Sequence, residues 1–452
     1  MNIETLKSIT LTILIAFSLF LTVSLWYYQP NLEPIDDKNV GADTNIEEGV
    51  TNNLSELVVP DRVILHKQDR FYSFRNQLDR ERFLSEVKNW TINGFSSRNF
   101  IPQKGLLAEL HFPTAIPSST IQNLFTLSEG AASGIIPEMN FKEVYFVNDN
   151  NEKVEVFFKK EDEEGYMVTA IQSVSALQRL DMQKINEPLN EQLLFDAEGV
   201  TERIFVPADA RKIPDYVLLA TDIDKEPLIS TLFTERNNVR VSSTSDNGKR
   251  YYDSESEMEV PNGDKYMRFR TATSTELSNM TMGDVLVQSI DFVNDHTGWT
   301  NKFQLTELTD RQATYRMHFQ GIPLLNWDNL TTIHIEYVQQ QVANYDRPLI
   351  SIEGELDNSD GDEDNGNVRQ LPSGETVTSY LVNNYDEDYL GRIEDVKIGY
   401  RLVSPAEASV VYYVQPYWHI KINGGWEQFE IDELSNMRSS GKGGAGLAMG
   451  PN

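Results

Sequence analysis

An uncharged stretch near the N-terminus constrains this chain more than any other feature. No charged residue occurs from Ser8 to Pro30, and the run from Ile9 to Trp26 is apolar apart from Ser and Thr. About 20 helical residues, each rising about 1.5 Å, cross a hydrocarbon core of roughly 30 Å. We therefore predict a transmembrane helix over residues 8–28, preceded by a short cytoplasmic tail over residues 1–7.

The far end of this stretch indicates a retained anchor. Trp26, Tyr27 and Tyr28 lie together there, where amphipathic rings favour the lipid headgroup layer, and Pro30 ends the helix. A cleaved signal peptide has a shorter apolar region, of about 7–15 residues, followed by a small-residue cleavage site. Because neither feature occurs here, we expect these three aromatic residues to hold an uncleaved helix at the membrane interface.

The orientation follows from the lengths on either side of the helix. Lys7 precedes it and Lys38 lies not far beyond it, so the positive-inside count decides little. A short tail followed by a long region favours translocation of the long region. We predict a single-pass protein of the cell membrane, with its N-terminus in the cytoplasm and its main body outside.

The same stretch carries small side chains at helical spacing. Ser8, Thr12 and Ala16 are four residues apart, and Ser18 and Thr22 form a second pair of this kind. Helices in lipid associate where small side chains let their backbones approach closely. These five residues are therefore a candidate interface with a partner helix. The ordinary frequency of Ser, Thr and Ala in membrane helices explains the pattern equally well, and the sequence leaves both interpretations open.

Charge and cysteine content exclude several classes of function. The chain has 69 acidic and 39 basic residues, a formal net charge of −30, and no cysteine. Such a negative field repels nucleic-acid phosphates, so we expect no nucleic-acid partner. The absence of cysteine excludes disulfides, thiolate metal ligands and thiol catalysis.

Composition and periodicity divide the region after the helix. Residues 29–57 are rich in acidic residues, Asn and Gly, which is typical of a flexible acidic stalk. The later segments mix strand-like and helical periods and predict an α+β fold of antiparallel sheets with covering helices. We predict three extracytoplasmic α+β domains and a disordered tail, over residues 58–200, 201–330, 331–437 and 438–452.

The clearest elements of the first domain are a helix and a hairpin. The run Leu78–Trp90 predicts a helix that buries Leu78, Phe83, Val87 and Trp90. The strand-like runs on either side of a polar turn predict a hairpin. These runs are Glu143–Val147 and Lys153–Phe158.

The second and third domains share an order of elements: a strand, a polar loop, a helix and two further strands. The spacing of about 90 residues suggests an internal repeat, although two unrelated sheet-and-helix domains would look similar. The predicted helices are Met282–Asn294 and Gly374–Asn384, and the predicted strands near them are Lys302–Leu308, Ala313–Phe319, Thr332–Val338, Ile393–Leu402, Ser409–Gln415 and Tyr417–Ile422.

No pattern in the sequence predicts a catalytic, cofactor-binding or metal site, and we expect no enzyme. The six histidines include no pair at i, i+3 or i+4, and His318 and His334 lie in strand-like runs, where a structural hydrogen bond is expected. Acidic residues alternate over residues 357–364 as in a calcium loop. The Gly and Glu that such a loop requires are replaced by Asn365 and Leu371, so we predict a solvated loop.

An alternative function is a cell-wall or ligand-binding module on a passive membrane anchor. Trp327, Tyr417, Trp418 and Trp426 are the aromatic residues that could line a groove for such a ligand. Burial of the same residues in a core is the competing interpretation.

Several segments resemble the YycH family of bacterial sensor-kinase regulators. They are Trp26–Pro30 at the outer end of the predicted helix, Val59–Ile64, Ser404-Pro405 and Tyr413–Trp418, and the similar layout extends over nearly the whole chain. The resemblance implies a non-catalytic membrane regulator of a sensor histidine kinase of the WalK (YycG) type, which controls cell-wall metabolism in Gram-positive bacteria. It also implies a second membrane partner of the YycI type, with contacts through the transmembrane helices. Activation and inhibition of the kinase are both compatible with it.

Overall fold

The structure is a computed structural model that describes the chain from residue 44 to residue 431 with internal gaps, and three short stretches before it. These stretches are residues 14–15, 17–19 and 33–34. The acidic loop 357–364 and the tail 438–452 lie outside the described residues. The gaps after residue 44 are residues 103, 130–135, 149–152, 162–163, 172–175, 177–178, 182–184, 235, 264, 273–279, 327, 357–367 and 405–409.

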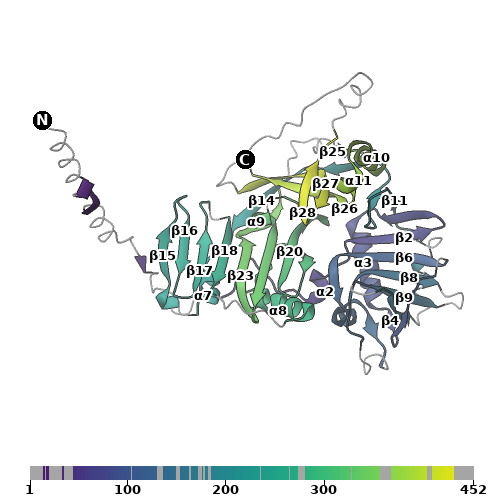
Figure 1. Ribbon diagram of the computed structural model, residues 1–452, viewed down its shortest axis with the longest axis horizontal. Coiled ribbons are helices and arrows are strands. Elements are labelled where there is room, and N and C mark those ends of the chain that lie inside the picture. Colours follow the sequence, from purple (N-terminus) through teal and green to yellow (C-terminus); the bar gives the residue numbers. More distant parts are fainter. Residues whose placement is uncertain are drawn as a thin grey trace, which may run out of the picture.

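The first sheet, which we call the N-terminal sheet, forms the blue end of the molecule in Figure 1. Its strands, in spatial order, are β12 (Phe205–Pro207), β11 (Leu189–Leu194), β3 (Arg70–Phe74), β2 (Arg62–Lys67), β6 (Leu106–Pro117), β8 (Asn140–Asn148), β9 (Val154–Lys160), β10 (Tyr166–Ile171), β4 (Thr91–Ile92) and β7 (Thr126–Leu127), with β5 (Ser96–Arg98) beside β10. Neighbouring strands are antiparallel, except that β4 and β7 run parallel. The predicted hairpin is confirmed as β8 and β9.

Helix α3 (Gln77–Lys88) packs against this sheet through its apolar face. Phe83, Val87 and the following Trp90 are buried, as the sequence predicts. The prediction that Leu78 is buried is wrong, because its side chain is 72% exposed. At about 100° per residue, Leu78 lies roughly 140° around the helix from Phe83 and therefore faces water.

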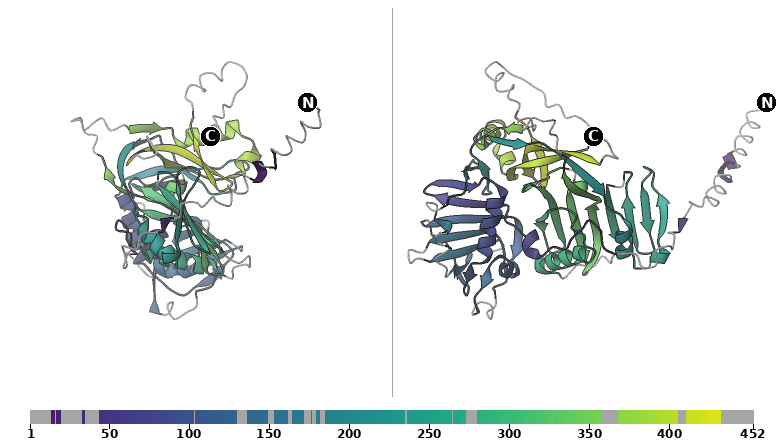
Figure 2. Two further views of the ribbon diagram at one scale, coloured as in Figure 1. Left: turned by 90° about the vertical axis from the view of Figure 1, so that its left-hand side faces the viewer. Right: turned by 180° about the vertical axis from the view of Figure 1, so that it is seen from behind.

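The second sheet, which we call the central sheet, is coloured teal to green in Figure 1. Its strands, in spatial order, are β1 (Glu33–Pro34), β15 (Arg240–Ser243), β16 (Lys249–Tyr252), β17 (Ser256–Val260), β18 (Tyr266–Thr271), β23 (Gln341–Pro348), β22 (Thr332–Val338), β20 (Gln312–Phe319) and β19 (Phe303–Leu308), with β21 (Ile322–Pro323) beside β20. Strand β19 lies against β6 of the N-terminal sheet, while β15 to β17 form the opposite end of the molecule (Figure 2).

Helix α8 (Met282–Asn294) covers the central sheet and has the bounds that the sequence predicts. Thr281 begins it, since its hydroxyl accepts a hydrogen bond from the Asp284 amide at 3.2 Å and Asp284 accepts one from the Thr281 amide at 2.9 Å. The apolar face then packs on β19 and β20. The other helical segments are α2 (Leu54–Leu57), η1 (Ser118–Thr120), α4 (Ile121–Leu124), α7 (Glu226–Leu232), η2 (Arg236–Asn238) and α9 (Asp328–Thr331).

The third sheet, which we call the C-terminal sheet, runs along one side of the other two (Figure 2). Its strands, in spatial order, are β24 (Ile350–Glu355), β14 (Tyr216–Asp222), β27 (Val411–Ile422) and β26 (Ile393–Val403), with β28 (Gly425–Phe429) also paired to β27. Helix α10 (Gly374–Asn384) has its predicted bounds and is followed by α11 (Glu387–Leu390). A separate pairing joins β13 (Arg211–Pro214) to β25 (Val368–Leu371).

The prediction of two strands over Ser409–Gln415 and Tyr417–Ile422 is wrong, because a single strand, β27, runs through Pro416. Proline lacks an amide hydrogen and normally interrupts a ladder. Here β14 pairs with β27 only up to Val414, and β28 begins to pair with it at Trp418. Pro416 lies between the segments of β27 that pair with β14 and with β28. Its lack of an amide hydrogen therefore costs no backbone hydrogen bond along this edge of β27.

The sheets confirm the predicted α+β class and cross the predicted domain limits. Strand β22 was assigned to the third domain and β20 to the second, yet they are neighbours in the central sheet. Strand β14, assigned to the second domain, lies in the C-terminal sheet. The division into three domains and the internal repeat therefore stay predictions.

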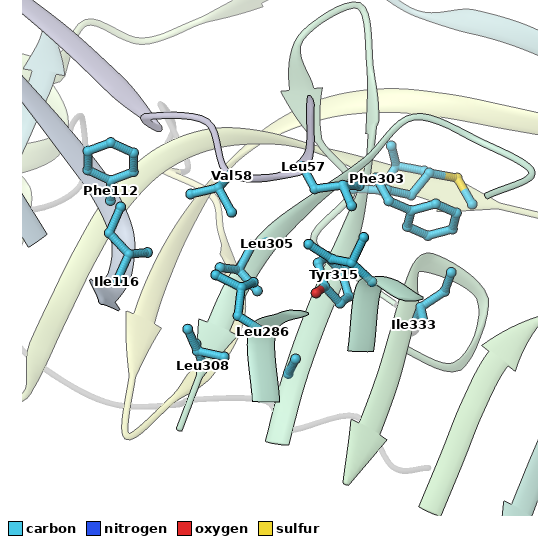
Figure 3. Packing of buried hydrophobic residues seen from close by; sticks show 14 of the residues in the cluster. Leu57, Val58, Phe112, Ile116, Leu286, Phe303, Leu305, Leu308, Tyr315 and Ile333 are labelled. Carbon is cyan, nitrogen blue, oxygen red and sulfur yellow. The ribbon is translucent and has the colours of Figure 1, made fainter. Parts of the chain in front are cut away.

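The hydrophobic core is continuous between the N-terminal and central sheets. Figure 3 shows Phe112 of β6 and Leu305 of β19 on either side of Val58, and Leu286 of α8 lies below them. These four side chains are all at most 3% exposed. Because apolar side chains from both sheets share one core, we expect the two sheets to unfold together.

We predict that Phe83→Ala destabilises the full-length protein by about 3–5 kcal/mol, because it leaves a cavity where a fully buried ring stood. Urea unfolding in detergent, followed by tryptophan fluorescence, measures the change. Leu78→Ala, on the exposed side of the same helix, is the control and should change the free energy of unfolding by at most about 0.5 kcal/mol. Equal effects of the two variants would contradict the assigned helix face.

Candidate functional site

Most residues of the predicted membrane helix lie outside the described residues. In the described part of it, Ser18 lies in the helical stretch Phe17–Leu19 and is exposed. Among the residues that the structure describes, no helix combines the length and the apolar character needed to cross a membrane. The following predicted site residues lie outside the described residues: Ser8, Thr12, Ala16, Thr22, Trp26, Tyr27 and Tyr28.

Residues 44–60, which we call the entry segment, lead from the predicted helix into the folded body and are firmly docked. The Ile46 amide donates to the His296 carbonyl at 3.0 Å, and Ile46 itself is 2% exposed. Val50 and Trp299 exchange backbone hydrogen bonds of 3.2 and 3.3 Å. Residues 44–57, which the sequence assigned to a flexible stalk, thus lie against the end of α8.

Asn294 and Gly49 explain why the entry segment fits there. The Asn294 side chain accepts from the Asn52 amide and donates to the Asn52 carbonyl, each at 2.9 Å, and so imitates a strand partner. A Cβ atom on Gly49 would lie 1.7 Å from the Thr297 carbonyl oxygen. Only glycine allows this approach, because any side chain would push the segment away.

The entry segment then reaches a group of partly buried charges between the first and last sheets, which we call the charge cluster. Arg62 of β2 donates to Asp395 of β26 at 2.5 Å. Lys397 of β26 contacts Asp61 at 2.5 Å and Asp395 at 2.8 Å. Trp426 of β28 covers the Lys397 ammonium at 5.0 Å. The cluster joins the beginning of the folded body to its end.

Electrostatics keep the charge cluster ionised. Burial alone would raise the pKa of Asp61, but Lys397 and Arg62 outweigh burial and hold this pKa far below its usual range. Burial likewise opposes ionisation of Asp395, whose pKa is nevertheless lowered by Arg62 and Lys397. Both carboxylates are therefore ionised at neutral pH, and each depends on its cationic partners.

A cavity of about 490 Å³ lies beside the charge cluster, between α3, the entry segment and β19. Its inner walls are apolar and include Val58, Phe112, Phe125 and Phe303. This volume falls within the range of about 300–1,000 Å³ that is usual for small-molecule sites.

Glu109 of β6 is the centre of a second buried cluster, which lies within the N-terminal sheet. Its carboxylate is inaccessible to solvent and accepts hydrogen bonds from His66 Nε2, His111 Nε2 and Arg203 Nη2, each at 2.7 Å. An ionised carboxylate only accepts, so both imidazoles donate through Nε2. Because Arg203 precedes β12, Glu109 fixes the chain where it returns to the sheet. Among the described residues, no group of three or more His, Asp or Glu side chains is arranged to hold a metal ion.

The aromatic residues considered for a ligand groove contribute mainly to the core. Trp418 is 2% exposed and donates through Nε1 to the Pro372 carbonyl at 3.0 Å. Tyr417 is 8% exposed, and Trp426 lies against Lys397. Trp327 lies outside the described residues.

The predicted structural roles of two histidines are confirmed. Nδ1 of His334 lies 3.0 Å from the Thr314 hydroxyl, and Nδ1 of His318 lies 3.0 Å from the Arg316 carbonyl.

These features define an α+β, sheet-dominated protein whose chain enters between two sheets that share one core. The family models described as "YycH protein, N-terminal domain" and "YycH protein, C-terminal domain" match residues 4–193 and 201–434. The chain therefore belongs to the YycH family, as the sequence resemblance implied.

A curated protein and a crystal structure, both of YycH from Bacillus subtilis, are similar to this chain. The chain is 20% identical over 454 residues to the "Two-component system WalR/WalK regulatory protein YycH" of Bacillus subtilis (strain 168), covering 94% of this chain and 96% of that protein. The crystal structure of YycH from Bacillus subtilis has the same fold, with a TM-score of 0.66 and 17% identity over 85% of this chain and 98% of that one.

The sequence alone predicts neither the charge cluster nor the cavity. Asp61 and Arg62 lie in Val59–Ile64, one of the segments that resemble the family. Asp395, the partner of Arg62 on β26, is 333 residues away from it in the chain. The available signal was the alternation of Asp395 and Lys397 in a strand otherwise rich in Val, Ile and Leu, which places both charges on one face.

We predict that Lys397→Met destabilises the protein by about 2–3 kcal/mol, because it removes one of the two cations, Lys397 and Arg62, that pair with the partly buried Asp61 and Asp395. Lys421→Met is the control, since its partner Glu394 keeps 42% of its side chain in water. That loss should stay within about 1 kcal/mol. Urea unfolding curves of both variants measure the difference, and a Lys397→Met protein as stable as the control would contradict the role of the cluster.

Three buried histidines predict a loss of stability in mild acid. Burial lowers the pKa of His296 to about 3, of His318 to about 3 and of His419 to about 4. In the unfolded chain their pKa returns to about 6.5, so that state binds more protons between these values. The free energy of unfolding should therefore fall by about 2 kcal/mol per histidine from about pH 7 to about pH 5.

Urea unfolding at both pH values checks this expectation. In His419→Gln, the decrease in the free energy of unfolding from about pH 7 to about pH 5 should be smaller by roughly 2 kcal/mol, the contribution of one histidine. Between about pH 7 and pH 8 these histidines are neutral in both states, so no change is expected from them there. Equal stability at pH 5 and pH 7 would contradict the prediction.

Proposed function

We propose that this protein is a membrane-anchored, non-catalytic regulator of a sensor histidine kinase of the WalK type, with its main body outside the cell. Membership of the YycH family over nearly the whole chain carries this proposal. The relative that covers 94% of this chain is a regulatory protein of the WalR/WalK two-component system. The uncharged stretch from Ser8 to Pro30 supports the membrane anchor.

The proposed mechanism is lateral contact between transmembrane helices. Ser8, Thr12 and Ala16 would present small side chains to the kinase or to a second membrane protein of the YycI type. A contact that differs in strength between two states of the kinase shifts the balance between them. Cell-wall metabolism is the process that such a kinase would control.

The docked entry segment supports a mechanical link between the body and the helix. Residues 44–60 are held to α8 by backbone and side-chain hydrogen bonds, and residues 29–43 connect them to the predicted helix. We propose that a rearrangement of the sheets is passed to the helix through this connection. A passive anchor needs no such attachment.

We predict that Ala16→Leu weakens association with the kinase without preventing membrane insertion, because the larger side chain keeps the helices apart. The tagged full-length protein is purified from native membranes, and its bound proteins are measured by quantitative mass spectrometry. Thr10→Leu is the matched control, since at about 100° per residue it lies on the opposite side of the predicted helix. We expect about a tenfold loss of kinase for Ala16→Leu, which corresponds to about 1.4 kcal/mol.

Three outcomes separate the alternatives. Equal recovery of the kinase with both variants would contradict the helix interface. Absence of a kinase from every preparation would contradict the proposed partner and favour the passive anchor. A YycI-type protein that is lost together with the kinase would support a three-component complex.

A further inference from the structure

The cavity beside the entry segment combines an apolar interior with two cations, Arg80 and Lys88, whose carboxylate neighbours among the described residues lie beyond ion-pair distance. Arg80 and Lys88 both line it, and among the described residues neither forms an ion pair. The Arg80 Nη1 atom donates to the Asp61 carbonyl at 3.2 Å, while its Nε atom is buried without a hydrogen-bond partner in the described structure. Burial lowers the pKa of Arg80 and of Lys88, so their charges are only partly compensated.

One face of α3 supplies both cations and part of the apolar wall. Arg80, Leu84 and Lys88 are four residues apart and therefore lie on one side of the helix. Lys88 reaches across to the entry segment, where its ammonium donates to the Ser55 carbonyl at 3.2 Å. The helix and the entry segment thus face each other across the cavity.

Two carboxylates also line this cavity, and each acts electrostatically on one of its cations, Glu81 on Arg80 and Glu56 on Lys88. Glu81 contacts Lys302 of β19 at 2.5 Å, and Glu56 accepts a hydrogen bond from the Asn53 amide at 2.8 Å. The net negative charge of the protein repels small anions in general. An anion that binds here consequently needs a second source of affinity, and the apolar interior offers one.

We propose that this cavity binds a single-chain amphiphile with an anionic head, such as a long-chain fatty acid. The head would contact Arg80 and Lys88, and the chain would extend among Leu84, Phe112 and Phe125. If each methylene group occupies about the volume of a water molecule in the liquid, ~30 Å³, the cavity holds roughly one aliphatic chain and not two. Val50, an exposed apolar residue of the lining, marks a route of entry from the surface.

Binding would act directly on the entry segment. Residues from Val50 to Pro60 form one wall of the cavity. A chain inserted between this wall and α3 would change the separation of the two, and residues 44–52 would transmit the change toward the membrane. The regulatory consequence rests on the proposed function, whereas binding itself does not.

Photolabelling of the full-length protein in lipid nanodiscs tests the proposal. The probe is a long-chain fatty acid with a diazirine in its chain, and labelled peptides are identified by mass spectrometry. We expect labels in the peptides that contain residues 50–60, 80–88 and 301–304. Unlabelled fatty acid should compete at least about tenfold better than the alcohol of equal chain length, because the alcohol lacks the charge that strengthens the hydrogen bonds.

Variants on the same helix provide matched controls. Leu84→Trp fills the cavity and should abolish its labelling, while Leu78→Trp on the exposed side should not. Lys88→Gln removes one cation and should weaken competition by about tenfold. Arg82→Gln, whose exposed side chain is absent from the lining, should leave it unchanged. The unfolding midpoint of each variant shows that it is folded.

Each contrary outcome overturns the proposal. Equal labelling in Leu84→Trp and the parent protein would exclude the cavity, and equal competition by the alcohol would exclude the anionic head. Labelling that appears in detergent free of phospholipid and is lost in the nanodiscs would identify a membrane lipid as the occupant instead. The labelling experiment contains no kinase, so its failure would not contradict the proposed regulation of the kinase. Equally, failure to recover a kinase by affinity purification would not contradict binding of the fatty acid.

Discussion

The partly buried charges of Asp61, Arg62, Asp395 and Lys397 fix how the N-terminal sheet lies against the C-terminal sheet. A charge removed from water is costly unless its partners stand at hydrogen-bonding distance. Here those partners come from β2 and β26, and Arg62 and Asp395 are 333 residues apart in the chain. Apolar contacts alone would tolerate small displacements of one sheet against another. The ion pairs do not, so they select one relative position of the first and last sheets.

The position of the entry segment depends on how the N-terminal and central sheets lie against each other. It comes from the predicted membrane helix, docks on the end of α8 through Asn294, lines the cavity and continues into β2 next to Asp61. The start of the folded body is therefore attached to the central sheet before it enters the N-terminal sheet. A displacement between these two sheets cannot leave the entry segment in place, because its residues contact both.

Much of the fold follows from local pattern. The helices at Met282–Asn294 and Gly374–Asn384 and the strand Thr332–Val338 have the bounds that periodicity predicts. Each has a long apolar repeat, and Thr281 and Ser373 supply the caps that begin the helices. Local pattern fails where a distant partner decides, as at Pro416, which a strand tolerates only because β14 and β28 divide its edge between them.

The candidate site is predictable only in part, for the same physical reason. Small residues in an apolar stretch are visible in sequence because a helix repeats every 3.6 residues. The cavity has no such signature, since α3, β19 and the entry segment meet there only after folding. The sequence does not single out Arg80 and Lys88 among the basic residues. That they form no ion pair with the described residues becomes visible only when the contacts of the folded chain are known. A regulator that responds to a ligand needs such a place, where binding energy alters the separation of two elements rather than merely filling a rigid core.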